Sequence, residues 1–105
     1  MRVTPDTILN AADMTSNQSA TQQLDQIFGY SVQAVYTGSP TGTLKLQASN
    51  DNTSYVDIAD SSNSITGAGE TMWNVTSANY AYVKVVYTAS SGSGSLTVKF
   101  FGRGF

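Results

Sequence analysis

Hydrophobic and polar residues alternate along most of this chain. The segment "FGYSVQAVY" (28–36) has an aromatic or aliphatic side chain at every second position, and "TLKLQAS" (43–49) repeats the pattern. Successive side chains of a β-strand point to opposite faces, so a period of two predicts strands with one buried and one exposed face. The same alternation predicts further strands in "SYVDIA" (54–59), "TMWNVT" (71–76), "NYAYVKVVYTA" (79–89) and "SLTVKFF" (95–101).

The phase of the alternation predicts which side chains form the core. On each run, the positions that hold most of the apolar residues are expected to face inward. Tyr80, Tyr82 and Phe101 fall on the opposite positions, and we expect them to face outward. The predicted inward residues are Phe28, Tyr30, Val32, Ala34, Tyr36, Leu44, Leu46, Ala48, Val56, Ile58, Trp73, Val75, Ala81, Val83, Val85, Tyr87, Leu96, Val98 and Phe100.

Short clusters of Gly, Ser, Asn and Pro separate the predicted strands, at 37–42, 50–52, 61–70 and 90–94. These residue types favour tight turns. Many short strands joined in this way predict an all-β fold, a single antiparallel β-sandwich. We place the sandwich domain at residues 26–105. Residues 1–25 alternate less regularly, and we expect an N-terminal arm or edge segment there.

The composition adds little charge to this pattern. Charged residues make up 11% of the 105 positions, well below the roughly 25% usual in globular proteins. Ser, Thr, Asn and Gln together fill 40 of the 105 positions, and the formal net charge is −2. The basic residues form no stripe, so we expect no nucleic acid partner. They are Arg2, Lys45, Lys84, Lys99 and Arg103.

No segment has the length of apolar sequence that a membrane requires. A spanning helix needs roughly 18 or more apolar residues, and none is present. Residues 1–13 also lack the apolar centre of a secretory signal. We therefore expect no membrane partner and a soluble protein that is made in a cytoplasm.

The chain contains neither cysteine nor histidine. Their absence excludes Cys- and His-ligated zinc sites, thiol nucleophiles, disulfides and imidazole bases. A paired-carboxylate mechanism needs two acids that face one cleft, but the acids fall mostly in predicted turns and near the N-terminus. We therefore expect no enzyme, no cofactor and no metal. The acids are Asp6, Asp13, Asp25, Asp51, Asp57, Asp60 and Glu70.

The polar cluster at 50–52, Asn-Asp-Asn, has two interpretations. A calcium loop of the EF-hand type requires several converging oxygens, a central Gly and a Glu at its twelfth position. Asp51 is the one carboxylate of the cluster, and no Gly follows it. Asn and Asp favour the backbone conformations of tight turns, so we prefer a hairpin tip to a calcium site.

Aromatic residues outside the core pattern also allow two interpretations. They can pack against a second sheet or a neighbouring subunit, which we prefer, or they can stack on a sugar ring. The C-terminal sequence "KFFGRGF" (99–105) favours a contact with another chain, because a small domain cannot easily bury all of its aromatic side chains. The candidates for glycan stacking are Tyr55, Trp73, Tyr80 and Tyr82.

The order of these segments resembles that of small β-sandwich virion proteins of bacteriophages. The resemblance covers about residues 28 to 103 and depends on the order and spacing of the segments together. It extends loosely to jelly-roll carbohydrate-binding modules, through the Ser-Asn-Asp turn (49–51) that precedes Tyr55. It implies a jelly-roll-like sandwich. The matching segments are "SVQA" (31–34), "GTLKLQASND" (42–51), "YAYVKVVYT" (80–88) and "GSGSLTVKF" (92–100).

The resemblance implies a non-enzymatic structural protein of the virion, such as a minor capsid, head-decoration (cement) or spike-type subunit. Its expected partners are copies of itself, in a homo-oligomer such as a trimer, and phage coat proteins, after synthesis in the host cytoplasm. The alternative is a receptor- or carbohydrate-binding module of a phage tail or fibre. The expected interface residues are Ile8, Leu9, Met14, Phe101, Arg103 and Phe105.

Overall fold

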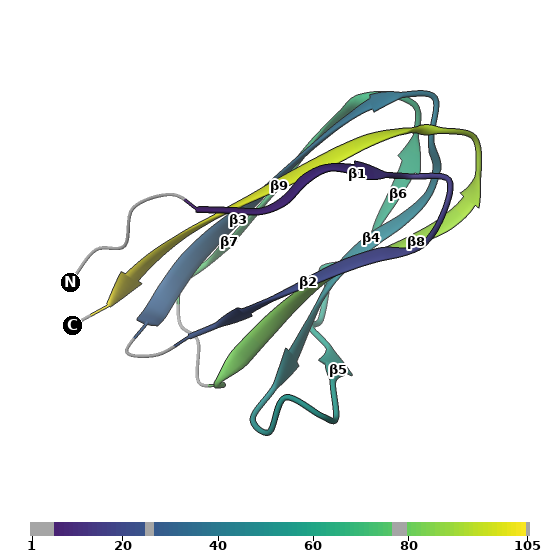
Figure 1. The fold of residues 1–105 in the computed structure, drawn as a ribbon. Helices are drawn as coiled ribbons and strands as arrows, with labels where there is room; N and C mark the ends of the chain where they lie inside the picture. Colours follow the sequence, from purple (N-terminus) through teal and green to yellow (C-terminus); the bar gives the residue numbers. More distant parts are fainter. Residues whose placement is uncertain (1–5, 25–26, 77–79, 105) are drawn as a thin grey trace.

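The computed structural model describes residues 6–24, 27–76 and 80–104, and the regular elements of these residues are β-strands (Figure 1). No helix in the described part of the chain is long and apolar enough to cross a membrane. The strands are β1 (Asp6–Asp13), β2 (Gln18–Gln23), β3 (Ile27–Gly38), β4 (Thr41–Ser49), β5 (Val56–Asp57), β6 (Asn63–Thr66), β7 (Gly69–Val75), β8 (Tyr82–Ser91) and β9 (Gly94–Gly104).

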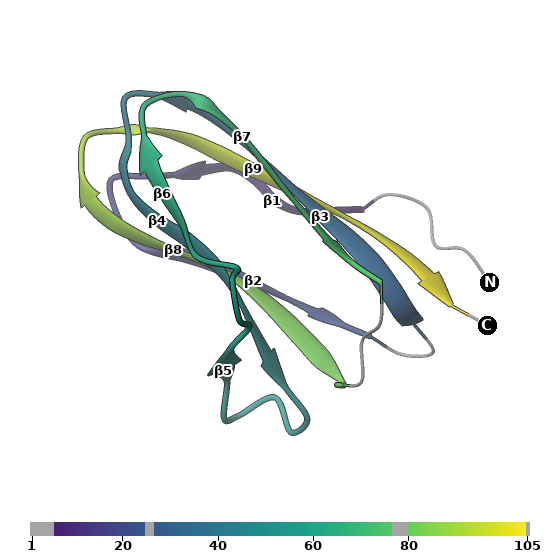
Figure 2. The same ribbon diagram turned by 180° about the vertical axis from the view of Figure 1, so that it is seen from behind.

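The strands form two antiparallel sheets that pack face to face (Figures 1 and 2). The first sheet has the order β1-β9-β3-β7. The second has the order β2-β8-β4-β5, with β6 also paired to β4. If the two-residue β5 is left out, the order is that of a jelly roll, in which eight strands form two four-stranded sheets. The predicted all-β, jelly-roll-like sandwich is therefore confirmed.

The two N-terminal strands lie at the edges of the sheets. β1 pairs with β9, but its register shifts twice and Ala11 has a positive φ of 52°. β2 pairs with β8 from Gln18 to Gln23 without a shift. The sequence predicted an arm or an edge segment for residues 1–25. The described strands of this segment are both edge strands, of which β1 is irregular and β2 is regular.

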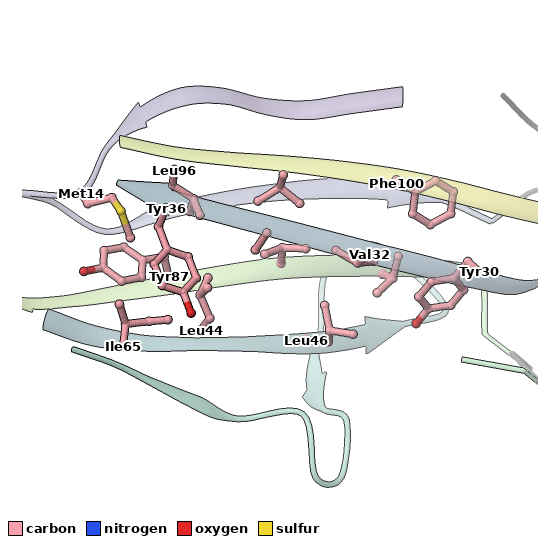
Figure 3. Close-up of a cluster of buried hydrophobic side chains, with 14 of the residues drawn as sticks. Met14, Tyr30, Val32, Tyr36, Leu44, Leu46, Ile65, Tyr87, Leu96 and Phe100 are labelled. Atoms are coloured by element: carbon pink, nitrogen blue, oxygen red, sulfur yellow. The ribbon is translucent and has the colours of Figure 1, made fainter. Parts of the chain in front are cut away.

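The centre of the sandwich consists of β3 and β9 in one sheet and β4 and β8 in the other. These four strands pair over most of their lengths, and their inward side chains form one buried layer (Figure 3). The buried apolar side chains are Met14, Leu24, Ile27, Tyr30, Val32, Ala34, Tyr36, Leu44, Leu46, Ile65, Val83, Val85, Tyr87, Leu96, Val98 and Phe100.

This core confirms most of the inward positions predicted from the alternation. The described side chains at those positions on β3, β8 and β9 are buried, and Trp73 and Val75 of β7 pack half-buried against the core. Val56 contradicts the prediction, because its side chain is 72% exposed. β5 pairs only with the end of β4 and projects from the body of the sandwich (Figure 1), so the opposite sheet does not cover it. The side chain of Phe28 lies outside the described ones.

Two turns meet backbone to backbone at one end of the sandwich. The Ser39 N–H donates a hydrogen bond to the Ser93 carbonyl (2.8 Å). Gly92 has a positive φ of 80°, and a Cβ there would collide with the Ser39 carbonyl. A Cβ at Gly94 would collide in the same way with the Thr37 carbonyl. This end of the fold therefore requires glycine, since no side chain fits between the two turns.

The 50–52 cluster is the tip of the connection between β4 and β5. The Asp51 carboxylate accepts hydrogen bonds from the backbone N–H groups of Thr53 and Ser54 (both 2.9 Å) and from the Ser49 hydroxyl (2.8 Å). β4 and β5 pair antiparallel on either side of the tip. The predicted hairpin tip is therefore confirmed.

The two asparagines of the tip also have structural roles. Asn52 has a positive φ of 58°, a conformation that Asn adopts more readily than most residues. The side-chain oxygen of Asn50 accepts a hydrogen bond from the Ala81 N–H (3.0 Å), which attaches the tip to the segment before β8. Among the described residues, no three Asp or Glu side chains lie together in a way that could hold a metal ion.

Two glycines within strands should respond differently to an added methyl group. A Cβ at Gly42 would collide with the Thr88 carbonyl and lie 2.9 Å from Cε1 of the buried Tyr87, whereas a Cβ at Gly29 would make an ordinary contact, 3.5 Å from the Val75 carbonyl. We expect Gly42→Ala to lower the free energy of unfolding by roughly 1–3 kcal/mol, as overpacking does. Gly29→Ala should leave it unchanged or raise it slightly. Urea denaturation measures both, and equal stabilities of the two variants would contradict the prediction.

Acid should weaken the turn that Asp51 holds. The N–H groups of Ser54 and Thr53 and the hydroxyl of Ser49 lower the pKa of Asp51 from 3.8 to about 2. A carboxyl group whose pKa is lowered by folding stabilises the protein above its unfolded-state pKa, and this contribution is lost as the pH falls from about 4 to about 2. In urea titrations, wild type and Asp51→Ala should therefore differ most near neutral pH and converge toward pH 2. A difference that stays constant over this range would show that the carboxylate charge is not involved.

Candidate interaction surfaces

The outer face of the first sheet carries exposed apolar side chains beside two exposed charged residues, Glu70 of β7 and Lys99 of β9. Met72 is 59% exposed and Val35 is 36% exposed. In the strand register, Met72 of β7 lies opposite Gln33 of β3, and the half-buried Phe101 of β9 lies opposite Ser31. Apolar groups within a polar rim are typical of surfaces that contact other molecules.

A hollow of about 590 Å³ opens on this face between Met72 and Phe101. Gly29 accounts for part of it, because the strand position there has no side chain to fill the space. Ser31 and Asn74 supply polar groups to its lining. We call it the Met72–Phe101 hollow, and it is lined by Gly29, Tyr30, Ser31, Met72, Asn74, Val75, Thr76 and Phe101.

The interface residues predicted from the sequence do not share this surface. Phe101 lines the hollow, whereas Ile8 and Leu9 lie half-buried on β1 and pack against the core. The backbone of Arg103 belongs to β9 and pairs with Gly29. The side chain of Arg103 and the whole of residue Phe105 lie outside the described part of the chain.

Met14 was also predicted to contact a partner, and the structure contradicts this. Its side chain is 0% exposed. Met14 follows β1, where the chain crosses to the second sheet, and its N–H donates to the Gly94 carbonyl (3.0 Å). Its side chain points into the same end of the core as Tyr36 and Leu96 (Figure 3). An unbranched, flexible side chain fills such a gap well, so Met14 is a core residue.

The outer face of the second sheet brings two predicted aromatic residues close to one lysine. The ammonium group of Lys84 lies 4.0 Å from the centroid of the Tyr55 ring, a cation–π contact. Tyr82 is the neighbouring outward residue of Lys84 on β8, and both tyrosines are half-buried. The Tyr55 hydroxyl donates a hydrogen bond to the side-chain oxygen of Asn52. Part of each ring is therefore open to solvent on a face that has a positive charge.

Asp57 links two neighbouring side chains on the same face. Its carboxylate accepts hydrogen bonds from the Gln47 amide (2.8 Å) and the Lys45 ammonium (3.2 Å). These two donors, Gln47 first, lower the pKa of Asp57. The ion pair is exposed, so we expect it to contribute little to stability. Its main effect is to balance the charge of Lys45.

Trp73 and Tyr80 belong to the inner packing of the sandwich. The Trp73 indole N–H donates to the Ser61 carbonyl (2.9 Å), and its ring lies half-buried against the core. Tyr80 packs edge-on against Tyr30, with ring centroids 6.5 Å apart, and the two hydroxyl groups form a hydrogen bond of 2.5 Å. The predicted outward position of Tyr80 is wrong, because β8 begins at Tyr82 and the alternation does not extend to residue 80.

Tyr30 has no environment that would favour proton transfer. Its ring stacks on Phe100, with centroids 5.4 Å apart. Burial raises the pKa of Tyr30, and the hydrogen bond with Tyr80 raises it further. The phenol therefore stays protonated at neutral pH and acts as a structural group.

Met72, Val35 and Gly29 were not predicted to take part in an interaction surface. A usable signal existed, because Met72 and Val35 are apolar residues at outward positions of their strands. Gly29 interrupts the row of outward side chains on β3, and glycine within a strand often marks a gap or a close approach. Their proximity to Phe101 depends on the strand register, which the sequence pattern does not provide.

Comparisons with known proteins support the fold. No protein-family model and no curated protein matches this sequence. The SPBc2 prophage-derived protein YomS is 16% identical with a TM-score of 0.62, over 93% of this chain and 91% of that one. The PBSX exported protein XepA is 11% identical with a TM-score of 0.67, over 96% of this chain and 37% of that one. A chain of infectious bursal disease virus, strain Gx, is 12% identical with a TM-score of 0.52, over 93% of this chain and 31% of that one.

At such low identity, these likenesses concern the fold. The chain shares its β-sandwich with a prophage-derived protein and with a virus protein. The resemblance to β-sandwich proteins of phages that the sequence indicated is thus confirmed at the level of the fold.

Proposed function

We propose that this chain is a non-enzymatic structural protein of a phage particle, a minor capsid, head-decoration or spike-type subunit. It acts in the virion through contacts with copies of itself and with coat proteins. The observation that carries the proposal is the Met72–Phe101 hollow, a largely apolar depression on an outer sheet face.

The chemistry of the hollow suits a protein partner. A side chain of a neighbouring protein can enter the space above Gly29, where Met72 and Phe101 provide apolar walls. The thioether of Met72 is flexible and adapts to the shape of such a group. Ser31 and Asn74 line the same hollow and can pair with polar groups of the partner, so the site has the apolar centre and polar rim typical of protein interfaces.

The many copies on a phage particle can make a contact as small as this hollow effective. A single small hollow gives weak binding, because association costs translational and rotational freedom. On a symmetric particle many copies bind at once, and multivalency makes weak contacts effective. The low charge of the chain, 11% of residues, also limits nonspecific electrostatic attachment.

Three of the acidic residues have structural roles. Asp51 holds the β4–β5 turn, and Asp57 pairs with Lys45 and Gln47. Asp13 accepts hydrogen bonds from the N–H and hydroxyl of Thr15, which lower its pKa. The proposal therefore includes no reaction.

The virion assignment predicts that the chain purifies with particles. Particles of the phage or prophage that encodes the chain, banded in a density gradient, should contain it. Met72→Lys should reduce its amount in the band at least tenfold, because a charge would have to be buried in the hollow. Val56→Lys is the matched control, since Val56 is also an exposed apolar residue but lies on β5. A chain found only in the unbanded fraction, or equal loss in both variants, would refute the role of this hollow.

The alternative, a receptor- or carbohydrate-binding module, is favoured by Tyr55, Tyr82 and Lys84 on the other outer face. Half-exposed tyrosine rings can stack on sugars. On a glycan array, the structural role predicts no saturable binding. Saturable binding that is lost in Tyr82→Ala and retained in Met72→Lys would support the alternative instead.

A further inference from the structure

β2 forms a regular sheet edge without the features that usually prevent contacts between edges. Its six residues pair with β8 without a bulge. The sequence "QSATQQ" (18–23) contains no charge and no proline. Proteins commonly block exposed edges with charges, prolines, bulges or very short strands, so an edge that has none of these is available for pairing.

The other edges among the described strands are protected. β1 has two register shifts and the positive φ of Ala11, while β5 and β6 contain only two and four residues. β7 is regular, but it carries the charged Glu70, and residues 61–63 are bonded to two of its side chains: the Ser61 carbonyl accepts the Trp73 indole N–H, and the Asn63 amide donates to the Thr71 hydroxyl (2.7 Å). β2 is therefore the open edge of this part of the chain (Figure 1).

Backbone groups of three β2 residues point away from the sheet. The Leu24 N–H donates to the Ala81 carbonyl (2.8 Å), where the β2–β8 register continues beyond the strand. The N–H and C=O groups of successive residues in a strand alternate between its two sides, so the even-numbered residues bond to β8. The backbone N–H and C=O groups of the odd-numbered residues Ser19, Thr21 and Gln23 therefore point to the open edge. The Gln22 side-chain amide reaches one of these groups, the Gln23 carbonyl (3.1 Å).

We propose that β2 pairs with the β2 strand of a second copy of this chain, antiparallel and about a two-fold axis at Thr21. The second sheets of the two copies then join into one continuous sheet. In this register Thr21 faces the partner's Thr21, and Ser19 faces the partner's Gln23. Each outward pair can exchange both of its backbone hydrogen bonds, as in an ordinary antiparallel ladder.

The charge pattern favours a second copy over a different protein. In a two-fold contact each surface meets its own copy, so any charge near the axis lies close to a like charge. Residues 14–24 contain no charged side chain, and the nearest charge in the register, Lys84 opposite Thr21, lies on β8, one strand away from the contact. The outward Ser, Thr and Gln side chains of β2 are exposed, and hydroxyl and amide groups can hydrogen-bond across such a pair.

The biological use of this β2–β2 pairing rests on the proposed function, because the pairing would join neighbouring copies of the chain on a particle. A single six-residue strand buries less than the roughly 1,200 Å² of a standard interface. We therefore expect a weak dimer in free solution that is strengthened by multivalency on the particle.

A single introduced thiol tests this contact, since the chain has no cysteine. Residues that face each other in a hydrogen-bonded antiparallel pair have Cα atoms roughly 5.5 Å apart, which suits a disulfide. On mild oxidation, purified Thr21→Cys should convert mostly to a cross-linked dimer. Thr88→Cys, an exposed position on β8 of the same sheet, should stay monomeric. Equal cross-linking of the two variants, or none in Thr21→Cys, would overturn the proposal.

Light scattering over a concentration series gives a second measure. Thr21→Pro removes an N–H that points to the open edge and leaves the bonds to β8 intact, so it should abolish the increase in mass with concentration. Thr21→Val keeps the N–H and a branched side chain, so its mass should still increase with concentration. A dimer that survives in a folded Thr21→Pro variant would overturn the proposal. If the chain bands with particles but Thr21→Cys does not cross-link, the β2 contact is refuted and the virion role is not. If Thr21→Cys cross-links but the chain does not band with particles, the virion role is refuted and the β2 contact is not.

Discussion

The burial of one layer of side chains between the strand pairs β3–β9 and β4–β8 determines the rest of this structure. Alternate residues of these four strands face inward, and large aromatic side chains such as Tyr87 and Phe100 are almost completely buried. A shift of any strand by one residue would exchange its inner and outer side chains, which would place polar groups in the core. The core therefore fixes the register, and the register determines which side chains lie on each outer face.

The same physical constraint explains how much of the fold could be predicted from the sequence. On runs such as that of Leu96, Val98 and Phe100, one phase of the alternation places apolar groups inward, so the core of the central strands was predictable. The prediction failed where the backbone is not in a central strand. Tyr80 precedes β8 and Val56 lies on a two-residue strand. Where a strand ends depends on partners far away in sequence, such as Asn50, which bonds the Ala81 N–H.

The candidate surfaces were less predictable than the core. The low overall charge follows directly from the composition. The Met72–Phe101 hollow instead requires the register of three strands, since its walls come from β3, β7 and β9. The contact between Lys84 and the Tyr55 ring requires the β4–β5 connection to lie over β8. Neither arrangement has a local sequence signal, because each joins residues that only the sheet topology brings together.

The two turns that meet at Gly92 and Gly94 have a consequence for how this protein can diverge over evolution. Their contact is made by bare backbone, so natural selection acts there on the lack of side chains and not on the kind of side chain present. A side chain at Gly92 or Gly94 would break the contact, so these two positions cannot become recognition residues. New specificity has to arise at other exposed positions, such as those on the outer faces of the two sheets.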